Sequence, residues 1–229
     1  MEDINEKWKN FKLSKDEISQ LRITRSMESG LTQSQKCYYL IGSVWEGKKV
    51  NKDAMVRTLC NLWKSKGNLT IKEIQENIFL FRFEDKEDYE RIREGRPWCF
   101  DRNIVVLKEF DEVFMEPEDV DYGKEEFWIH ILGLPTRFME REVACAIGNT
   151  IARFIKVDGE NTGLRDKFMR IKVLLDLAKP LRRGLMLSME ENHVKWITLQ
   201  YESLPQFCFK CGRMGHIESN CAYQCMDEN

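Results

Sequence analysis

The sequence predicts an α+β protein in which two sandwiches of strands and helices occur in tandem and a small metal-binding module follows them. Three observations support this prediction. Residues 35–111 and residues 127–204 each alternate short apolar strands with amphipathic helices. The segment between them is acidic and has no sustained apolar periodicity. After residue 204, cysteines and a histidine fall at the spacing of metal ligands.

In the first unit, residues 35–111, the predicted order of elements is β-α-β-β-α-β. Its strands are short runs rich in apolar and aromatic residues: Cys37–Val44, Leu69–Ile74, Asn77–Phe83 and Ile104–Phe110. Two helices are expected between them, one with apolar residues at helical spacing and one highly charged: Lys52–Lys64 and Lys86–Glu94. Gly95 and Pro97 end the second helix. This order is typical of a ferredoxin-like or RRM-like sandwich, with helices on one face of an antiparallel sheet.

Two segments flank this unit. Residues 1–34 are polar and weakly patterned, and one amphipathic helix is the only element we expect there. Residues 112–126 carry like charges and lack sustained periodicity. This acidic stretch is therefore the predicted linker between the two sandwiches.

The second unit, residues 127–204, is predicted to be another α+β sandwich whose last helix is replaced by strands. One helix is expected, Met139–Ile151, because its apolar residues recur at helical spacing. The expected strands are Phe127–Gly133, Ala152–Val157, Phe168–Leu177, Gly184–Met189 and Lys195–Glu202. Residues 165–183 contain seven cations against two acids, which makes this unit the basic one.

The composition narrows the classes of function. The net charge of −2 argues against a protein that coats nucleic acid by bulk charge, so any such binding must use local patches. No run approaches the roughly 18 apolar residues of a membrane span, and the first twenty residues lack the layout of a signal peptide. We therefore expect an intracellular protein, in the nucleus rather than the cytoplasm. Its eight cysteines are then thiols or metal ligands rather than disulfides.

The most specific motif lies in residues 205–223. Cys208, Cys211, His216 and Cys221 follow the spacing Cys-x₂-Cys-x₄-His-x₄-Cys. Three thiolates and one imidazole complete the tetrahedral coordination of Zn²⁺ and leave no position for water, which predicts one structural zinc ion and no catalytic one. The segment is too short to bury a core, so metal binding must supply its folding free energy.

The glycines of this segment fit a tight wrap around a metal, because Gly212 and Gly215 tolerate positive φ. The alternative is that four ligand residues fall at these spacings by chance in a disordered tail. Cys225 belongs to the tail of residues 224–229 and lies outside the pattern. It is expected to be a free thiol, and the alternative is that it substitutes for one of the four ligands.

The stretch CFKCGRMGHIESNC resembles the CCHC zinc knuckle of retroviral nucleocapsid and retrotransposon proteins. The resemblance implies that Phe209 and Ile217 form an apolar cleft for an unpaired base, because such modules reach single-stranded bases. Lys210 and Arg213 would add phosphate contacts, but they face Glu218, Asp227 and Glu228, so the phosphate attraction is expected to be weak. A protein–protein role of the knuckle remains the alternative.

Upstream, the blocks REGRPWCFDRNIVVLKEF and LPQFCFKCGRMGH carry a second resemblance. From about residue 31 to residue 221, the chain resembles a plant domain of unknown function (DUF4283 type) joined to a CCHC zinc knuckle. This combination occurs in LINE-type retrotransposon first-open-reading-frame products and in genes derived from them. The resemblance implies an RRM-like nucleic-acid chaperone or packaging protein without catalytic activity.

An RRM stacks bases on aromatic residues of its two central strands, so the face of each strand matters. In the first unit, we expect Ile78, Leu80 and Leu40 on the base-reading face. The phenylalanines of the same strand then alternate onto the core side, towards the helices: Phe79, Phe81 and Phe83. The first sandwich is thus predicted to have lost its reading face and to use it for packing or self-association.

The second unit keeps such a face in this interpretation. Trp128 and His130 share one face of the strand that begins the unit, and Phe168, Arg170 and Lys172 share one face of the long strand. Aromatic rings and cations together indicate a surface for a nucleic-acid strand, and Arg182 and Arg183 extend the basic region. The alternative is that Trp128 and Phe168 are buried and the cations only solvate an edge.

The sequence contains no pattern typical of a nucleophilic, metal-hydrolytic or phosphate-loop active site, so we expect no enzyme. The predicted function is zinc-dependent, retroelement-derived binding of single-stranded RNA or DNA, with RNA expected. The alternative is an adaptor that uses the same sandwich and knuckle surfaces to bind protein.

Overall fold

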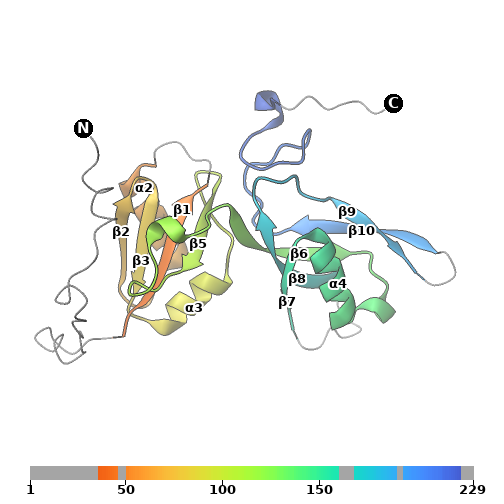
Figure 1. Cartoon of the computed structure of the whole chain (residues 1–229), viewed down its shortest axis with the longest axis horizontal. Helices are drawn as coiled ribbons and strands as arrows, with labels where there is room; N and C mark the ends of the chain where they lie inside the picture. The colour runs from red at the N-terminus through yellow and green to blue at the C-terminus, as the bar shows by residue number, and fades with distance from the viewer. Residues whose placement is uncertain (1–35, 46–49, 160–167, 190–192, 223–229) are drawn as a thin grey trace, which may run out of the picture. The chain divides into compact units, whose positions relative to one another are not determined.

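The computed structural model describes residues 36–45, 50–159, 168–189 and 193–222. Within these ranges the chain forms three α-helices and two antiparallel five-stranded sheets, followed by the cysteine-rich segment (Figure 1). The helix expected in residues 1–34 lies outside the described residues, as do the tail of residues 224–229 and Cys225. Not one of the helices in these ranges combines the length and the apolar character that crossing a bilayer requires.

The first sheet has the strand order β2-β3-β1-β5-β4, and every neighbouring pair is antiparallel. Its elements are β1 (Tyr38–Val44), α2 (Lys52–Trp63), β2 (Leu69–Gln75), β3 (Ile78–Phe83), α3 (Lys86–Glu94), β4 (Trp98–Phe100) and β5 (Asn103–Glu109). The six expected elements are present, with ends that differ by one residue at most. The added strand β4 forms a hairpin with β5 through Asp101 and Arg102, which both have positive φ. Three residues directly after Pro97 are too few to show an alternating pattern, so the sequence did not indicate this strand.

Both helices of this unit begin at side chains that cap their first turn. Asn51 accepts a hydrogen bond from the backbone nitrogen of Ala54 at 3.0 Å, and Asp85 accepts one from Asp88 at 2.8 Å. These bonds satisfy backbone donors that a helix leaves without a partner. The acids before α3 therefore start a helix, as their position in the sequence indicates.

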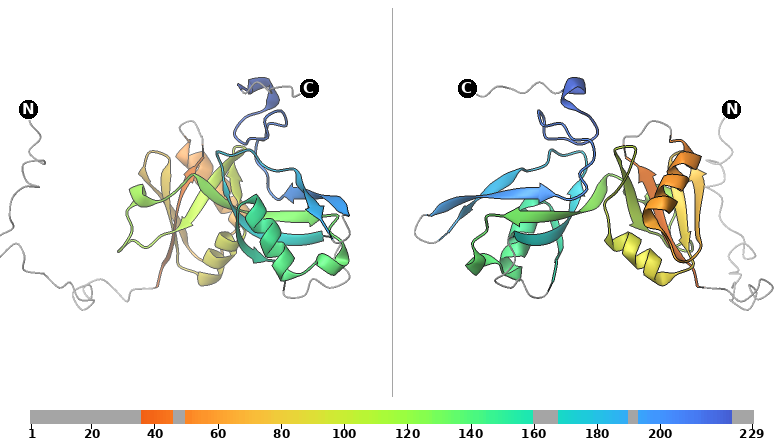
Figure 2. Two further views of the ribbon diagram at one scale, coloured as in Figure 1. Left: turned by 45° about the vertical axis from the view of Figure 1, so that its right-hand side comes forward. Right: turned by 180° about the vertical axis from the view of Figure 1, so that it is seen from behind.

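The core of the first sandwich lies between its sheet and the helices α2 and α3, which cover one face (Figures 1 and 2). Phe79, Phe81 and Phe83 are buried there against Trp63 of α2. The prediction that this phenylalanine run is core is confirmed. Ile78 and Leu80 alternate with it and lie on the opposite face of β3.

The prediction that Leu40 shares a face with Ile78 and Leu80 is wrong. In the observed register Leu40 pairs with Phe81, and Ile41 pairs with Leu80. Directly opposed residues on neighbouring strands point to the same face, so Leu40 belongs to the helix-covered core. An assignment that is off by one residue exchanges the two faces of a strand, and this error placed Leu40 on the wrong side.

The second sheet has the strand order β7-β8-β6-β10-β9 and is also antiparallel throughout. Its elements are β6 (Lys124–Leu132), α4 (Arg141–Ile151), β7 (Arg153–Val157), β8 (Phe168–Asp176), β9 (Gly184–Ser188) and β10 (Val194–Tyr201). Short 3₁₀ turns occur at Pro117–Asp119 (η2), Thr136–Phe138 (η3) and Glu218–Asn220 (η5). Counted from its first strand, this sheet repeats the order of the first sheet. The connection between β8 and β9 contains no helix, whereas α3 lies at the equivalent place in the first sandwich.

The core of the second sandwich lies between its sheet and α4. Alternate residues of β6 and β8 point into it, and Gly148 of α4 packs directly on Phe154, where a Cβ would lie 2.6 Å from the ring. Ile104 and Val106 of β5 belong to the same buried cluster. These two residues alternate with the core residues Val105 and Leu107, so they lie on the face of the first sheet that the helices leave open. Part of that face therefore packs against the second sandwich within the chain.

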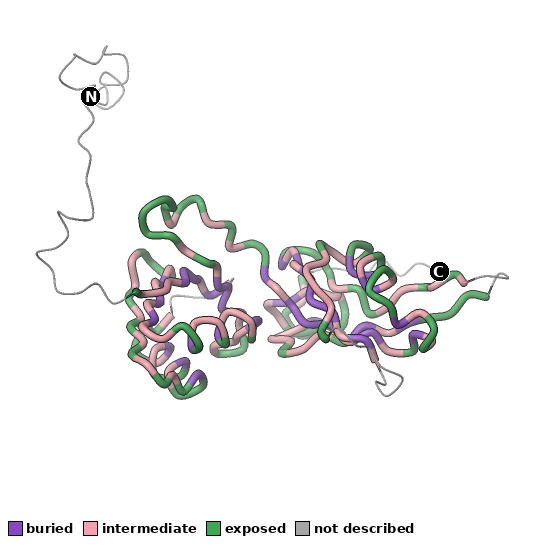
Figure 3. The backbone as a smooth tube through the Cα atoms, turned by 90° about the horizontal axis from the view of Figure 1, so that it is seen from below, coloured by how far each residue is buried: buried purple, intermediate pink, exposed green. Residues whose placement is uncertain are grey.

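The acidic segment between the two sheets is shorter than predicted, because β6 already begins at Lys124. Most of its residues are exposed, and they appear green in Figure 3, in which buried residues are purple. Gln75 of β2 donates a hydrogen bond to Glu118, and the Lys108 ammonium donates one to the carbonyl of Lys124 at 2.6 Å. Polar contacts thus hold the segment at its middle and at its C-terminal end.

Candidate metal centre and nucleic-acid interface

The backbone of the cysteine-rich segment wraps tightly around its first two cysteines. Phe207 and Met214 form a β-bridge, and Cys208 exchanges hydrogen bonds with Arg213 and Gly212 at 2.9 Å each. Gly212 has a φ of +73° and Gly215 a φ of +91°. Both values lie in the region that favours glycine, so the role predicted for these two residues is confirmed.

This wrap brings the four predicted ligands together. One ligand atom from each of Cys208, Cys211, His216 and Cys221 lies within 4.8 Å of the others, and Cys211 Sγ is 3.2 Å from His216 Nε2. In a tetrahedral zinc site with bonds of about 2.0–2.3 Å, neighbouring ligand atoms are roughly 3.5–4 Å apart. The spacing and the donor types therefore fit Zn²⁺. Four protein ligands would leave no open coordination position, which fits a structural centre.

The knuckle packs on the second sandwich. Met214 is 2% exposed and belongs to the same buried cluster as the β6 and β8 core residues. The backbone nitrogen of Leu181 donates to the carbonyl of Gly212 at 2.7 Å, and the Arg213 guanidinium donates to the carbonyl of Ala178. The knuckle therefore contacts the connection that stands in place of the second helix. The sequence did not indicate this contact, because periodicity reports nothing about long-range packing of a single methionine.

The two apolar residues expected to receive a base are on the surface of the knuckle. Phe209 is 77% exposed, and Ile217 is exposed as well. The ring of Phe209 contacts the edge of Phe207, with the centroids 5.1 Å apart. Lys210 beside it is exposed, whereas Arg213 is half-buried through its contact with Ala178. A large apolar side chain held at the surface by a partly buried neighbour is suited to stacking on a flat ligand.

On the second sheet, the predicted alignment of faces is confirmed. Trp128 pairs with Lys172, His130 with Arg170, and Leu132 with Phe168 across β6 and β8. Their alternate neighbours form the core on the α4 side, so all six lie on the open face. The rings of His130 and Phe168 stack with centroids 4.1 Å apart.

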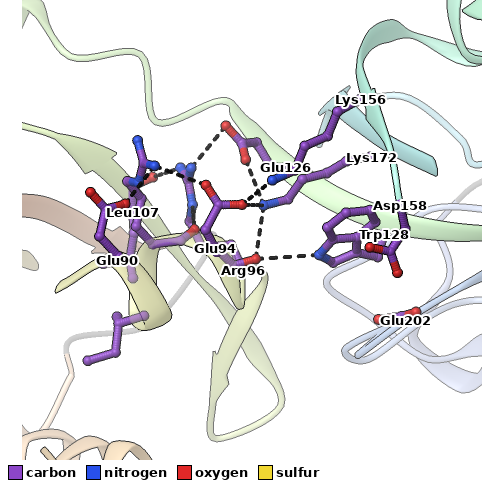
Figure 4. A network of polar contacts seen from close by, with 12 residues as sticks. Glu90, Glu94, Arg96, Leu107, Glu126, Trp128, Lys156, Asp158, Lys172 and Glu202 are labelled. Carbon is purple, nitrogen blue, oxygen red and sulfur yellow. Dashed lines mark hydrogen bonds and ion pairs between the residues drawn. The ribbon is translucent and has the colours of Figure 1, made fainter. Parts of the chain in front are cut away.

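One end of this face is closed by contacts with the first sandwich. The Lys172 side chain is 1% exposed, and its Nζ donates to the Glu94 carbonyl and pairs with Glu126 Oε2, both at 3.0 Å (Figure 4). The Trp128 indole donates to the same carbonyl at 3.4 Å. Glu94 is the last residue of α3, where the helix dipole attracts a cation. Burial lowers the pKa of Lys172, and the two carboxylates oppose that shift.

The positive charge of Arg170 is balanced by two carboxylates of the same chain. It forms two hydrogen bonds with Glu202, at 2.6 and 2.8 Å, and one with Asp158 at 2.7 Å. Its guanidinium also lies 3.8 Å from the centre of the Trp128 ring. The hydrogen bond with Glu202 raises the pKa of Arg170, and the same contact lowers the pKa of Glu202. The sequence did not reveal these partners, because Asp158 and Glu202 follow other strands that only the fold brings beside β8.

The other end of the face is open and apolar. Trp196 is 51% exposed and pairs across the hairpin with Met186, which is also exposed. Gly184 lies under the indole, since a Cβ there would be 2.3 Å from the Trp196 ring. Trp196 is two residues from Thr198, the partner of Leu132, so it shares the face of Phe168 and His130. We call Trp196, Met186, Phe168 and His130 the aromatic strip.

Trp196 and Met186 were not among the residues that sequence reasoning selected. The alternation in VKWITLQY, with Ile197 and Leu199 in the core, is the signal that could have found Trp196. The two predicted arginines, Arg182 and Arg183, are exposed in the connection before β9, and their carbonyls accept hydrogen bonds from Tyr201 and Leu199. The connection before β9 therefore carries exposed cations that do not belong to the closed end of the face.

Comparison with known proteins matches both parts of the chain. Residues 33–116 match the family described as a domain of unknown function (DUF4283), and residues 175–223 match the family described as a zinc knuckle. A stretch of 100 residues is 24% identical to an uncharacterized protein of Arabidopsis thaliana, and this stretch covers 43% of the chain and 32% of that relative. The chain thus spans about a third of the relative it matches. No solved structure matches the chain.

Proposed function

Because the chain carries a DUF4283 domain followed by a CCHC-type zinc knuckle, we propose that it binds single-stranded nucleic acid and catalyses no reaction. The binding surface consists of the aromatic strip on the second sheet and the exposed apolar pair of the knuckle, Phe209 and Ile217. The observation that carries this proposal is the open sheet face that Trp196, Phe168 and His130 share, with the rings of Phe168 and His130 stacked on each other. Unpaired bases stack on such side chains whatever their sequence.

The strand order supports an RRM-like assignment for both sandwiches. In each sheet the first strand lies between the third and the last strand, and the second strand is at the edge, next to the third. An RRM presents bases to aromatic residues on its two central strands. In the second sheet these are β6 and β8, which carry His130 and Phe168. In the first sheet the corresponding face carries aliphatic residues and packs partly within the chain, so we assign the binding to the second sheet.

We assign phosphate contacts to three exposed cations of the second sandwich and the knuckle, namely Arg182, Arg183 and Lys210. Arg170 and Lys172 have a different role in this proposal, because their charges are balanced by Glu202, Asp158, Glu94 and Glu126. Arg170 and Lys172 stabilise the closed end of the open face, and the Arg170 guanidinium packs on the Trp128 ring. Because only a few exposed cations contribute to this surface, the affinity should depend only moderately on salt concentration.

One Zn²⁺ is proposed to be held by the four knuckle ligands. When bound, the ion supplies folding free energy to the knuckle rather than a reactive centre. Its removal would release Phe209 from its fixed place beside Phe207. RNA as the bound strand, a nuclear location and an origin from a LINE-type retroelement are further parts of the proposal, and the resemblance of the two sequence blocks supports them.

The experiment is a titration of labelled single- and double-stranded oligonucleotides with the wild-type chain and with Trp196→Ala. Loss of one stacked base costs about 1–3 kcal/mol, so the variant should bind the single strand roughly tenfold more weakly. The loss should persist at high salt, because stacking is not screened. Leu62→Ala, an exposed apolar residue of α2, is the matched control and should bind like the wild type.

An adaptor that binds protein through the same surfaces is the alternative function. The exposed apolar side chains Met186 and Ile217 would suit a protein partner as well as a base. The adaptor predicts that Trp196→Ala and Phe209→Ala leave oligonucleotide affinity unchanged at every ionic strength. Such a result for both variants would replace nucleic-acid binding with the adaptor role.

A further inference from the structure

A pocket in the second sandwich lies apart from the aromatic strip and shares only Arg182 with the proposed nucleic-acid surface. It has a volume of about 700 Å³ and lies where β6, β7 and β8 meet the connection between β8 and β9. Apolar side chains that include Ile151, Leu175 and Leu181 line it. Leu175 belongs to the core cluster on the α4 side of the sheet, so the pocket is distinct from the aromatic strip on the open face.

The topology explains why the pocket exists. In the first sandwich, α3 follows the third strand and buries Ile92 in the core. In the second sandwich the equivalent connection has no helix, and part of the apolar surface near the end of β8 therefore has no covering element. Residues 178–181 reach the knuckle instead, through Leu181 and Gly212. An apolar cavity that a repeated fold leaves at the place of a missing helix is suited to an apolar side chain from elsewhere.

The rim of the pocket is cationic. The described residues that line it include four cations and one carboxylate: Lys124, Arg153, Lys179, Arg182 and Asp176. Lys124 pairs with Asp121, and Lys179 pairs with Asp176. Both pairs are exposed, so water and salt screen them and a new acidic partner can compete. An apolar floor with this rim is complementary to an apolar side chain flanked by acids.

The chain itself presents such a group. In the acidic segment, Phe114 is 85% exposed and Val113 is exposed beside it. A turn holds them out, because the backbone nitrogens of Phe114 and Met115 donate to the carbonyl of Asp111, and that of Val113 donates to its carboxylate. Acids surround this tip on both sides in sequence: Asp111, Glu112, Glu116 and Glu118. We call residues 111–116 the acidic turn.

We propose that the acidic turn of one molecule binds in the basic-rimmed pocket of a second copy of the chain. The turn is exposed, so it does not occupy the pocket of its own molecule. The acidic turn is complementary to the pocket in both apolar and ionic character. Phe114 enters the cavity, and the acids of the turn pair with Arg153 and Lys179 at the rim. The two patches are different surfaces, so the contact is heterologous and one molecule can bind a partner at each end.

The test uses two variants of the full chain that each lose one half of the contact. Phe114→Asp removes the apolar tip but keeps the pocket. Arg153→Glu combined with Lys179→Glu reverses the rim but keeps the turn. In sedimentation velocity, the wild type should form dimers and larger species as concentration rises, and added salt should reduce them. Each variant alone should sediment as a monomer.

An equimolar mixture of the two variants should restore one contact and stop at a one-to-one dimer. Leu62→Asp and the pair Lys52→Glu with Arg57→Glu, all on exposed positions of α2, are the matched controls and should associate like the wild type. Far-ultraviolet circular dichroism and bound zinc should be unchanged in every variant, so that failure to fold is recognised.

Three results would overturn the proposal: a wild type that stays monomeric, single variants that associate like the wild type, or a mixture that stays monomeric. An oligonucleotide titration of the rim variant separates this proposal from the proposed function. If reversal of the rim weakens oligonucleotide binding and the wild type is monomeric, the pocket belongs to the nucleic-acid surface. If association is seen but oligonucleotides do not bind, self-association stands and nucleic-acid binding fails.

Discussion

Among single residues, the charges on the open face of the second sheet are mostly balanced within the chain. Lys172 is buried between the last turn of α3 and Glu126, and Arg170 is held by Glu202 and Asp158. The sequence predicted that both cations share a face, because alternation along β8 fixes which side each residue takes. It could not predict that acids from α3, from β6 and from the ends of β7 and β10 would reach them, since these contacts depend on the fold of the whole chain.

Lys172 should matter for stability. Lys172→Met would remove the buried cation shared by Glu94 and Glu126, which keep Lys156 and Arg96 as partners. It should lower the free energy of unfolding by roughly 2 kcal/mol, less than for a fully buried pair, because both carboxylates reach solvent and keep another cation. Lys179→Met, at an exposed pair, is the control and should change stability by less than about 0.5 kcal/mol. Urea denaturation of both variants measures the difference. Equal midpoints would show that the buried ammonium does not stabilise the fold.

Glu202 should make the free energy of unfolding depend on pH. Arg170 lowers the pKa of Glu202 in the folded chain, so the unfolded chain binds the extra proton more readily. The stabilisation is therefore present above the usual glutamate pKa of about 4.3 and is lost as pH falls through the lower folded value. Thermal melts between about pH 6 and pH 3 should show a shallower loss for Glu202→Gln than for the wild type. Zinc release at low pH affects both proteins alike, so parallel curves would contradict the coupling.

Among the elements, most strands and helices of both sandwiches follow from local sequence. Apolar periodicity and capping residues indicate α2 and α3 to within one residue, and the same holds for the strands around them. The three-residue strand β4 is too short for any period to show. Leu40 shows a second limit, because choosing the inward residue of β1 required the register with β3, which the strand itself does not encode.

The packing of the knuckle could not be predicted in this way either. A complete ligand set predicts the metal-binding residues, because coordination chemistry fixes the spacing. The burial of Met214 in the core of the second sandwich depends on the missing helix between β8 and β9. The knuckle and the second sheet therefore form one packed unit, although the sequence suggests a separate tail after residue 204.

Zinc removal should consequently affect more than the knuckle. Chelation, or Cys211→Ser, should abolish hydrogen-exchange protection in residues 205–222 and lower it in residues 177–185 and in β10. Protection in α2 and β3 should change little, because their core does not include Met214. Hydrogen exchange with mass spectrometry reads all these segments in one experiment. A loss confined to residues 205–222 would show that the packing of Met214 contributes nothing to the second sandwich.

For the molecule as a whole, the two sheets repeat one strand order but differ in what covers them. The open face of the first sheet packs in part on the second sandwich, whereas the second sheet keeps the aromatic strip exposed. The missing helix of the second sandwich makes room for the knuckle and leaves the basic-rimmed pocket. The same strand order therefore serves two roles. The first sandwich uses part of its open face to pack on the second, whereas the second sandwich exposes the aromatic strip and the basic-rimmed pocket.

The most direct measurement is ultraviolet crosslinking of a single-stranded oligonucleotide of mixed sequence to the zinc-bound chain, followed by mass-spectrometric identification of the crosslinked residues. Crosslinks form where a base lies against a side chain, so they should occur at Trp196 or Phe168 on the second sheet and at Phe209 in the knuckle. Double-stranded competitor should not remove them. An oligonucleotide that binds but crosslinks only to the first sheet, or to neither the strip nor the knuckle, would contradict the central claim.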